Sequence, residues 1–175
     1  MKKTSTKKRI KHDQIQQVFI MTEIGEIYII GSNDLIFMIN NKKNPRYPMQ
    51  LNSKTQLTIL RKAQKQIREY LSGKRRKIEL PFKLEGTAFQ QTVWKEVHKI
   101  PFGQKLTYKE LAQKIENPKA LRAVGSAVGK NPLCLLIPCH RIIGSKGKLG
   151  GFSMGFEIKK YLLNLEGSIK EIINL

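Results

Sequence analysis

The stretch TYKELAQKIENPKALRAVGSAVGKNP, residues 107–132, decides the fold. Thr107, followed three residues later by Glu110, forms a capping box, which predicts a helix over TYKELAQKIE. Asn117 and Pro118 supply an N-cap and a first-turn proline for a second helix over PKALRAVGSAVG, which KNP closes. Two short helices joined by a tight turn are typical of a helix-turn-helix.

The segments around this motif extend it into a mainly helical domain. Upstream, Thr87 and Gln90 form another capping box, and the helix that follows ends at PFG, residues 101–103. Downstream, the apolar run LCLLIP, residues 133–138, predicts a strand that runs into Cys139. The loop GSKGKLGGFSMG then leads to an amphipathic helix that Gly167 ends, with an apolar face made of Ile158, Tyr161, Leu162 and Leu165.

The N-terminal part predicts a small α/β unit. QVFIMT, EIYIIG and DLIFMIN are short, β-branched or aromatic and separated by turns, which favours a three-stranded antiparallel meander. Ser53 opens a capping box before a helix that Gly73 ends, and residues 74–77 (KRRK) form an exposed linker. We therefore divide the chain into a basic flexible arm (1–14), an N-terminal α/β domain (15–85) and a C-terminal domain (86–175).

The formal net charge of +20 is the strongest compositional signal. Basic side chains release counterions from phosphates, so nucleic acid is the first candidate partner. An acidic membrane surface and a merely solvated Lys-rich surface are the alternatives. Residues 1–11 hold six basic residues and no acid. They either contact DNA electrostatically or have no specific role, and the sequence favours neither alternative. Without a secretory signal or a run of ~20 apolar residues, we expect a cytoplasmic, nucleoid-associated protein, nuclear in a eukaryote.

The chain has two cysteines, which do not make a disulfide framework. A bridge between Cys134 and Cys139 is sterically possible but disfavoured in a reducing compartment. A structural zinc site would need about four ligands at recognisable spacing, so no metal is expected. Cys134, among leucines, fits a packed core thiol.

Cys139 differs because it follows Pro138 and precedes the ionisable His140 and Arg141. A cationic neighbourhood lowers the pKa of a thiol, and the thiolate is the nucleophile. Adjacent residues of an extended strand point to opposite faces, so contact between Cys139 and His140 requires a sharp turn at the strand end. On the residues alone, a buried thiol and a nucleophile both remain open.

IPCHR preceded by NP, and both preceded by a helix-turn-helix carrying RAVG, resembles the O6-alkylguanine-DNA alkyltransferases, the suicide methylated-DNA–protein-cysteine methyltransferases. The resemblance covers about residues 89–167. The N-terminal unit resembles the family only in outline, as a small sheet plus helix of RNase H-like type. The implied fold is this α/β unit followed by a mainly helical, winged-helix-like domain.

The resemblance implies a role for each residue of the motif. Cys139 would accept the alkyl group of O6-alkylguanine, and of O4-methylthymine, in one irreversible displacement. His140 would take the thiol proton through a water, and Glu166 would orient that His, which is the triad logic with sulfur. Asn131 would hold the turn before Cys139. Without the resemblance, Glu166 reads as a solvated helix-end acid and Asn131 as a plain turn residue.

The target atom lies inside the duplex stack, so the base must be flipped out. In the family the second helix of the motif lies in the minor groove, where Arg122 would fill the gap; a surface salt bridge is its alternative. Tyr108 would rotate the target phosphate and protonate the leaving guanine, or else be a half-buried core residue. Small residues would let the helix approach the DNA backbone, or instead serve helix packing: Ala123, Gly125 and Ser126, together with Ala127 and Gly129.

The resemblance assigns the alkylguanine pocket to Pro138, Arg141, Ile142, Phe152 and Ser153. Phe152 stands where the family often has Tyr, and Met154 where a small residue is common, so both could slow transfer or reshape the pocket. The expected partner is double-stranded DNA containing alkylated guanine, with the protein acting as a monomer and needing no cofactor or membrane.

Two other function classes compete with this reading. A helix-turn-helix module that recognises lesions without transfer is disfavoured by Cys139, His140 and Glu166. A cysteine hydrolase is disfavoured because no oxyanion hole is evident.

Overall fold

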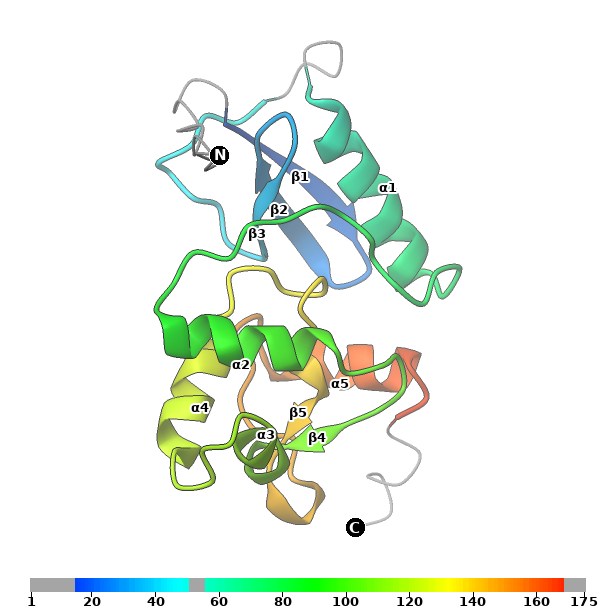
Figure 1. Ribbon diagram of the computed structural model, residues 1–175. Helices are drawn as coiled ribbons and strands as arrows, with labels where there is room; N and C mark the ends of the chain where they lie inside the picture. The colour runs from blue at the N-terminus through cyan, green and yellow to red at the C-terminus, as the bar shows by residue number, and fades with distance from the viewer. Residues whose placement is uncertain (1–14, 51–55, 169–175) are drawn as a thin grey trace, which may run out of the picture.

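The computed structural model describes residues 15–50 and 56–168. The predicted arm, residues 1–14, lies outside them. An N-terminal half with a small sheet and one helix stands above a C-terminal half that is mainly helical (Figure 1). None of the helices in the described ranges is long and apolar enough to cross a membrane.

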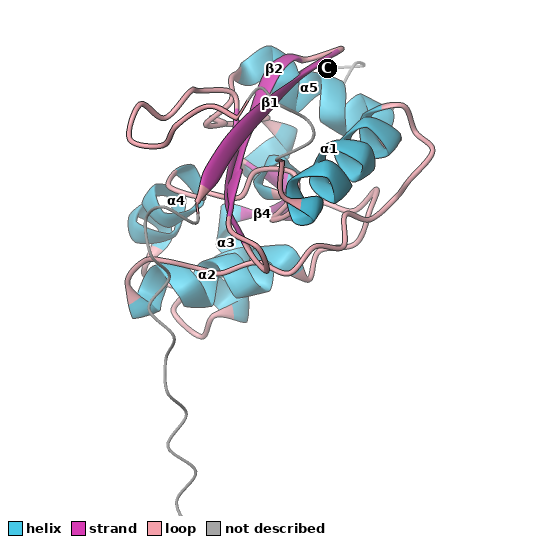
Figure 2. Cartoon of the chain, turned by 90° about the horizontal axis from the view of Figure 1, so that it is seen from above, coloured by secondary structure: helices cyan, strands magenta, loops and turns pink. Residues whose placement is uncertain are grey.

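The N-terminal half is the predicted antiparallel meander, in the order β1-β2-β3, made of β1 (Gln16–Thr22), β2 (Gly25–Gly31) and β3 (Ile36–Asn40). Helix α1 (Thr58–Leu71) lies along one face of this sheet (Figure 2). Its apolar face buries Leu60, Ala63 and Ile67 in the core that also holds Ile27 and Ile29 of β2. The 3.6-residue apolar stripe of the helix and the inward side chains of the sheet therefore share one core.

The ends of α1 agree only in part with the sequence prediction. Ser53, the predicted capping residue, lies outside the described residues, and the helix begins at Thr58 after Leu57, which makes no side-chain cap. Gly73 ends the helix as predicted, at φ +74°, which favours glycine. In the linker that follows, Arg75 is half-buried and donates to Glu69 Oε2 at 2.8 Å, while its three neighbours are exposed.

The C-terminal half contains α2 (Ala88–His98), β4 (Leu106–Thr107), α3 (Tyr108–Lys114), α4 (Leu121–Gly129), β5 (Ile142–Ile143) and α5 (Phe156–Leu165), with single 3-10 turns η2 (Cys139–Arg141) and η3 (Ser145–Gly147). Both predicted capping boxes form, at Thr87 and at Thr107. The two-residue strands β4 and β5 pair in parallel. Trp94 of α2 is buried and donates to the carbonyl of Ala127 in α4 at 2.8 Å, which ties α2 to the helix-turn-helix.

The start of the second helix of the motif was predicted wrongly. Helix α4 begins at Leu121, not at Pro118, and Ala120 occupies its N-cap. Glu116 has φ +55°, and the amide of Asn117 donates to the carbonyl of Ala112 at 2.9 Å. Asn117 and Pro118 therefore belong to the turn after α3, in which the carbonyl of Asn117 also accepts from the amide of Ala120 at 3.0 Å.

The predicted strand over residues 133–138 is also wrong. Only Leu133 makes a β-bridge, to Ile39 at the edge of β3. Leu135 has φ +69°, the amide of Ile137 donates to the Leu133 carbonyl at 2.8 Å, and the chain then enters the 3-10 turn at Cys139. The run is apolar because it is buried between the two halves, and burial does not require an extended backbone.

Candidate active site

Asn131 holds the turn that presents Cys139. Its side-chain amide donates to the carbonyl of Ile137 at 2.8 Å and lies 3.0 Å from Cys139 Sγ. Its side-chain oxygen accepts from the amide of Leu133 at 3.0 Å. The buried Asn131 side chain thus makes three hydrogen bonds in place of the backbone hydrogen bonds of a strand. One of the three reaches the sulfur atom of Cys139.

His140 and Glu166 form a buried pair next to this turn. Nε2 of His140 lies 2.7 Å from Oε1 of Glu166, and both side chains are fully buried. Nδ1 of His140 is buried and has no hydrogen-bond partner in the described part of the chain. Burial lowers the pKa of His140 against the raising effect of Glu166, so the ring is neutral at neutral pH. A neutral ring bonded to Glu166 through Nε2–H leaves the Nδ1 lone pair free to accept a proton.

Glu166 is a buried helix C-cap rather than a solvated acid. Arg141 donates to its carboxylate through Nε at 2.9 Å and through Nη2 at 3.0 Å, and the amide of Gly103 adds a bond at 3.0 Å. Burial alone would raise the pKa of this carboxyl group, but the hydrogen bonds from His140 and Arg141 and the charge of Arg141 outweigh burial and lower the pKa to about 2. The carboxylate is therefore permanently charged at neutral pH.

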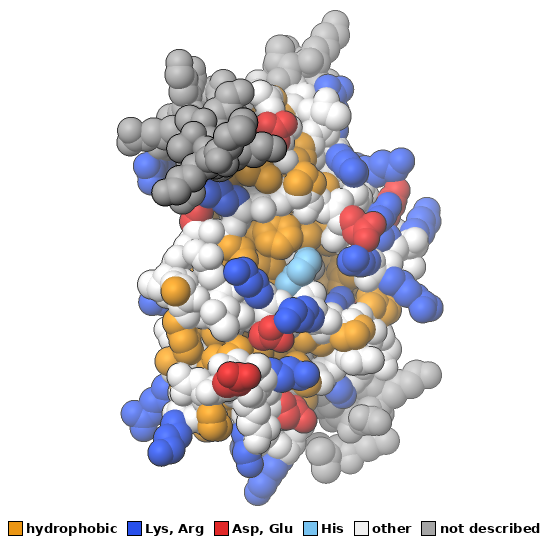
Figure 3. All heavy atoms as spheres, viewed as in Figure 1, with side chains coloured by type: hydrophobic (Ala, Val, Ile, Leu, Met, Phe, Trp, Pro, Cys, Tyr) orange, Lys and Arg blue, Asp and Glu red, His pale blue; other side chains and the backbone are white. Residues whose placement is uncertain are grey.

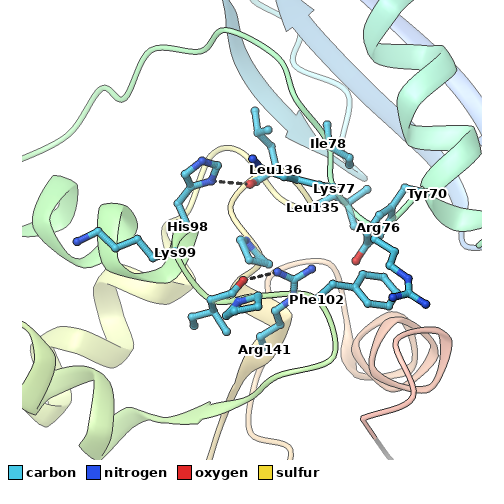
Figure 4. A pocket seen from close by; sticks show the side chains of 13 residues that line it. Tyr70, Arg76, Lys77, Ile78, His98, Lys99, Phe102, Leu135, Leu136 and Arg141 are labelled. Atoms are coloured by element: carbon cyan, nitrogen blue, oxygen red, sulfur yellow. Dashed lines mark hydrogen bonds between the residues drawn. The ribbon is translucent and has the colours of Figure 1, made fainter.

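Tyr70 completes this cluster, and sequence reasoning missed it. Its hydroxyl donates to Oε1 of Glu166 and lies 3.4 Å from Nε2 of His140. Burial and the Glu166 charge raise the pKa of Tyr70, so it stays a protonated donor. Tyr70 belongs to α1 of the N-terminal half and lines the cavity drawn in Figure 4. On the sequence it is one more residue of an apolar helix face.

The predicted lowering of the Cys139 pKa by cationic neighbours is wrong. The neighbouring Cys134 thiol and burial raise the pKa of Cys139, and the amide of Asn131 only partly offsets them. The guanidinium of Arg141 is instead bonded to Glu166 and to the carbonyl of Ile100. That carbonyl accepts from Nη1 at 2.5 Å (Figure 4). His140 is neutral, so the resting group is a thiol that needs a base.

A cavity of about 290 Å³ opens at Cys139. It brings together several of the predicted site residues from α3, α4 and the loop before α5, namely Tyr108, Gly125, Phe152 and Ser153. The Phe152 ring stands edge-on to the His140 ring at a centroid distance of 6.2 Å. Met154 is buried away from the lining, and its carbonyl accepts from the Asn41 side chain at 2.9 Å.

Pro138 and Arg141, which the resemblance assigned to the same pocket, lie elsewhere. They line a second cavity of about 350 Å³ at the junction of the two halves, together with Tyr70 and Phe102 (Figure 4). The reason is the 3-10 turn, which rotates Arg141 to the far side of Cys139. Ile142 is fully buried in β5 and pairs with Leu106 of β4.

Lys159 is a second site residue that sequence reasoning missed. This fully buried lysine of α5 donates to the carbonyls of Ile142 at 2.6 Å and Gly151 at 3.3 Å, and also to that of Leu149. Burial lowers its pKa to about 8. Lys159 thereby fixes the loop that forms one wall of the Cys139 cavity. The signal was available, because Lys159 shares a helical face with Leu162.

The outward face of α4 carries the predicted DNA-contact residues. Arg122, Ala123 and Ser126 are exposed, whereas Val124 and Ala127 are buried. Helix packing therefore does not account for the small size of Ala123 and Ser126. Within the part of the chain that the structure describes, Arg122 makes no hydrogen bond or ion pair, unlike a surface salt-bridge residue.

Comparisons with known proteins identify the family to which the chain belongs. Residues 88–168 match the family described as "6-O-methylguanine DNA methyltransferase, DNA binding domain", and residues 15–84 match its "ribonuclease-like domain". A methylated-DNA–protein-cysteine methyltransferase of Methanosarcina acetivorans is 39% identical over 148 residues, covering 83% of this chain and 94% of the relative. The chain belongs to the 6-O-methylguanine DNA methyltransferase family.

Further relatives support this membership in the methyltransferase family. The methylated-DNA–protein-cysteine methyltransferase of Haemophilus influenzae is 40% identical over 149 residues, covering 82% of this chain and 81% of the relative. The crystal structure of Mycobacterium tuberculosis OGT in complex with DNA matches with a TM-score of 0.79 and 33% identity, covering 87% and 93% of the two chains. The resemblance drawn from the IPCHR motif and the expected fold class are therefore confirmed.

Proposed function

We propose that this methyltransferase repairs alkylated DNA by direct reversal and that Cys139 is its alkyl acceptor. The observation that carries the proposal is the hydrogen bond from Glu166 to His140, which leaves Nδ1 free on the residue after Cys139, a thiol that lines a cavity. The family relatives are named for transfer from methylated DNA to a protein cysteine, and the relative of known structure was solved with DNA.

Proton transfer is the first task, because the pKa of Cys139 is raised. Nδ1 of His140 takes the thiol proton through one water, since no direct hydrogen bond joins the two residues among the described contacts. Glu166 accepts the Nε2–H bond, fixes the tautomer and stabilises the imidazolium ion that forms. The amide of Asn131, 3.0 Å from Sγ, donates to the developing thiolate.

Alkyl transfer then follows as a displacement at the alkyl carbon. The S–C bond forms while the bond from O6 to that carbon breaks, and the electron pair leaves with the guanine. Tyr108 lines the cavity, and burial and Cys139 raise its pKa, so its hydroxyl keeps a proton to donate to the leaving base. A thioether is not readily hydrolysed, so each molecule acts once.

DNA binding in this account uses the exposed face of α4. This helix enters the minor groove, Arg122 fills the space of the flipped base, and Ala123, Gly125 and Ser126 permit close approach to the backbone. Lys and Arg side chains lie over both halves on the face drawn in Figure 3, in keeping with the net charge of +20 and electrostatic attraction to phosphates. We propose a monomer, acting in the nucleoid of the cytoplasm or in a nucleus, with the domain division 15–85 and 86–175.

The flipped base occupies the Cys139 cavity, where Phe152 and Ser153 form the loop side. Backbone groups of Cys139, Ile142 and Ser153 read the guanine edge, and O4-methylthymine is a second substrate. Phe152 provides an apolar wall without a hydroxyl for O6.

A matched pair of cysteine variants tests the acceptor. The substrate is a duplex whose O6-methylguanine carries a radiolabelled methyl group. Cys139→Ser should take up no label yet bind the duplex, whereas Cys134→Val should take up label as the natural chain does. Label in Cys139→Ser would overturn the assignment.

A further inference from the structure

We propose that Cys134 and Cys139 form a redox pair, in which peroxide converts the two thiols to a disulfide that reversibly blocks the alkyl acceptor. The alkyl transfer described above makes no use of Cys134. The pairing itself rests on geometry, and only its consequence for repair rests on the proposed function.

Three contacts bring the two thiols together. Both cysteines are free and buried. Asn131 touches both, with its side-chain amide 3.0 Å from Cys139 Sγ and its carbonyl oxygen 3.8 Å from Cys134 Sγ. Cys134 Sγ also lies 3.3 Å from Oγ of Ser153, which lines the same cavity as Cys139. The Cys134 thiol is also the largest cause of the raised pKa of Cys139, so the two groups interact directly.

The turn between the two cysteines makes this approach possible. An extended strand would separate residues five apart by about 3.3 Å per residue, far beyond the Cα separation of about 4.4–6.8 Å that a disulfide needs. Here the chain reverses at Leu135, with φ +69°, and the Ile137 amide closes the turn on the Leu133 carbonyl at 2.8 Å. The feature that contradicted the predicted strand is therefore the one that brings the sulfur atoms together.

The chemistry balances with hydrogen peroxide as the oxidant. The Cys139 thiolate attacks one peroxide oxygen; the O–O bond breaks and hydroxide leaves, giving a sulfenic acid. The Cys134 sulfur then attacks Cys139 Sγ, so that the S–S bond forms and the S–O bond breaks. The leaving hydroxides take up the two thiol protons as water. Two thiols and one peroxide thus give one disulfide and two waters.

The disulfide would protect a protein that can act only once. Sulfinic and sulfonic acids of cysteine are not reversed by thiols, whereas a disulfide is. Protein disulfides in reducing compartments are mostly transient and redox-sensing, which fits a pair that cellular thiols would reopen. Cys134 would then act as the resolving cysteine for Cys139.

Peptide mapping of the full chain tests the proposal. Trypsin releases residues 131–141, which hold both cysteines, as one peptide. After peroxide treatment of the folded protein, this peptide should lose two hydrogens and take up no iodoacetamide. Dithiothreitol should then restore both labelling sites and methyl transfer. The mass readout does not depend on transfer, so its failure is distinct from failure of the proposed function.

Cys134→Val is the matched control, with methyl transfer before oxidation as the check that it folds. In this variant peroxide should add oxygens to Cys139, and dithiothreitol should not restore transfer. The proposal is overturned if the natural chain acquires oxygens on Cys139 as fast as the variant, stays reduced, or forms only disulfides between chains. Cys134→Ser, which keeps a polar group near Ser153, provides a second variant if Val disturbs folding.

Discussion

Tyr70 and Glu166 share a buried hydrogen bond although they lie 96 residues apart and belong to different halves of the molecule. The same carboxylate oxygen accepts from His140, so a residue of the N-terminal half contacts the group that we propose as the base for Cys139. The N-terminal half is therefore part of the active site in this account, and it does more than cover the helical half.

Replacing Tyr70 by Phe should affect both stability and pH dependence. Loss of a buried bond to a charged group should lower the free energy of unfolding by about 1.5–3 kcal/mol. With one donor fewer, the carboxylate should hold the imidazolium more strongly, so the pKa of His140 should rise. The acid limb of the single-turnover rate should then move to higher pH.

Tyr161→Phe is the control for this change, because its hydroxyl bonds the Leu71 carbonyl at 3.3 Å outside the cluster. Its pH profile should match that of the natural chain. A Tyr70→Phe profile with an unmoved acid limb would reduce Tyr70 to a packing role.

Replacing Asn131 by Ala should leave the Leu133 amide and the Ile137 carbonyl unpaired in a buried turn. Each such group should cost about 1–3 kcal/mol in urea unfolding. The methyl-transfer rate should also fall, because the thiolate loses its donor. Asn117→Ala, in an exposed turn, should change neither quantity, and equal behaviour of the two variants would refute the role of Asn131.

Glu166 should make stability depend on acid pH. Its folded pKa of about 2 lies below the ordinary value of 4.5, so its contribution to stability is present above pH 4.5 and is lost as the pH falls toward 2. A pKa shift of this size corresponds to about 3 kcal/mol in the free energy of unfolding. Urea midpoints at pH 5 and pH 3 should differ more for the natural chain than for Glu166→Gln. Parallel curves would contradict the assignment.

Replacing Arg122 by Ala should slow repair of duplex DNA by about tenfold to a hundredfold, since base flipping costs a few kcal/mol. Reaction with free O6-benzylguanine requires no flipping and should be nearly unchanged. Lys119→Ala, an exposed cation on the preceding turn, controls for lost charge and should weaken binding only modestly. Equal losses on duplex and free base would reject the intercalating role.

The parts of the fold that local sequence determines were predictable. The capping boxes at Thr87 and Thr107 and the stop at Gly73 each depend on residues within one turn of the helix, and all three formed. The turn over residues 133–138 was not predictable, because an apolar run reports burial and not backbone conformation. Burial between the two halves decides its shape.

The site was predictable only where the motif names its residues. Cys139, His140 and Glu166 followed from the resemblance, but Tyr70 joins them through a contact across the whole fold. Arg141 was assigned to the pocket by the resemblance, and the 3-10 turn directs it to Glu166 instead. Adjacency in the sequence does not fix the side of a turn on which a side chain lies.

The most direct test of the central claim is mass spectrometry of the intact chain after incubation with a duplex carrying one O6-methylguanine. Replacement of one hydrogen by one methyl group per chain, found on Cys139 in the peptide 131–141 and never exceeding one, is the predicted result. An unmodified chain that binds the same duplex, or a methyl group on any residue other than Cys139, would contradict it.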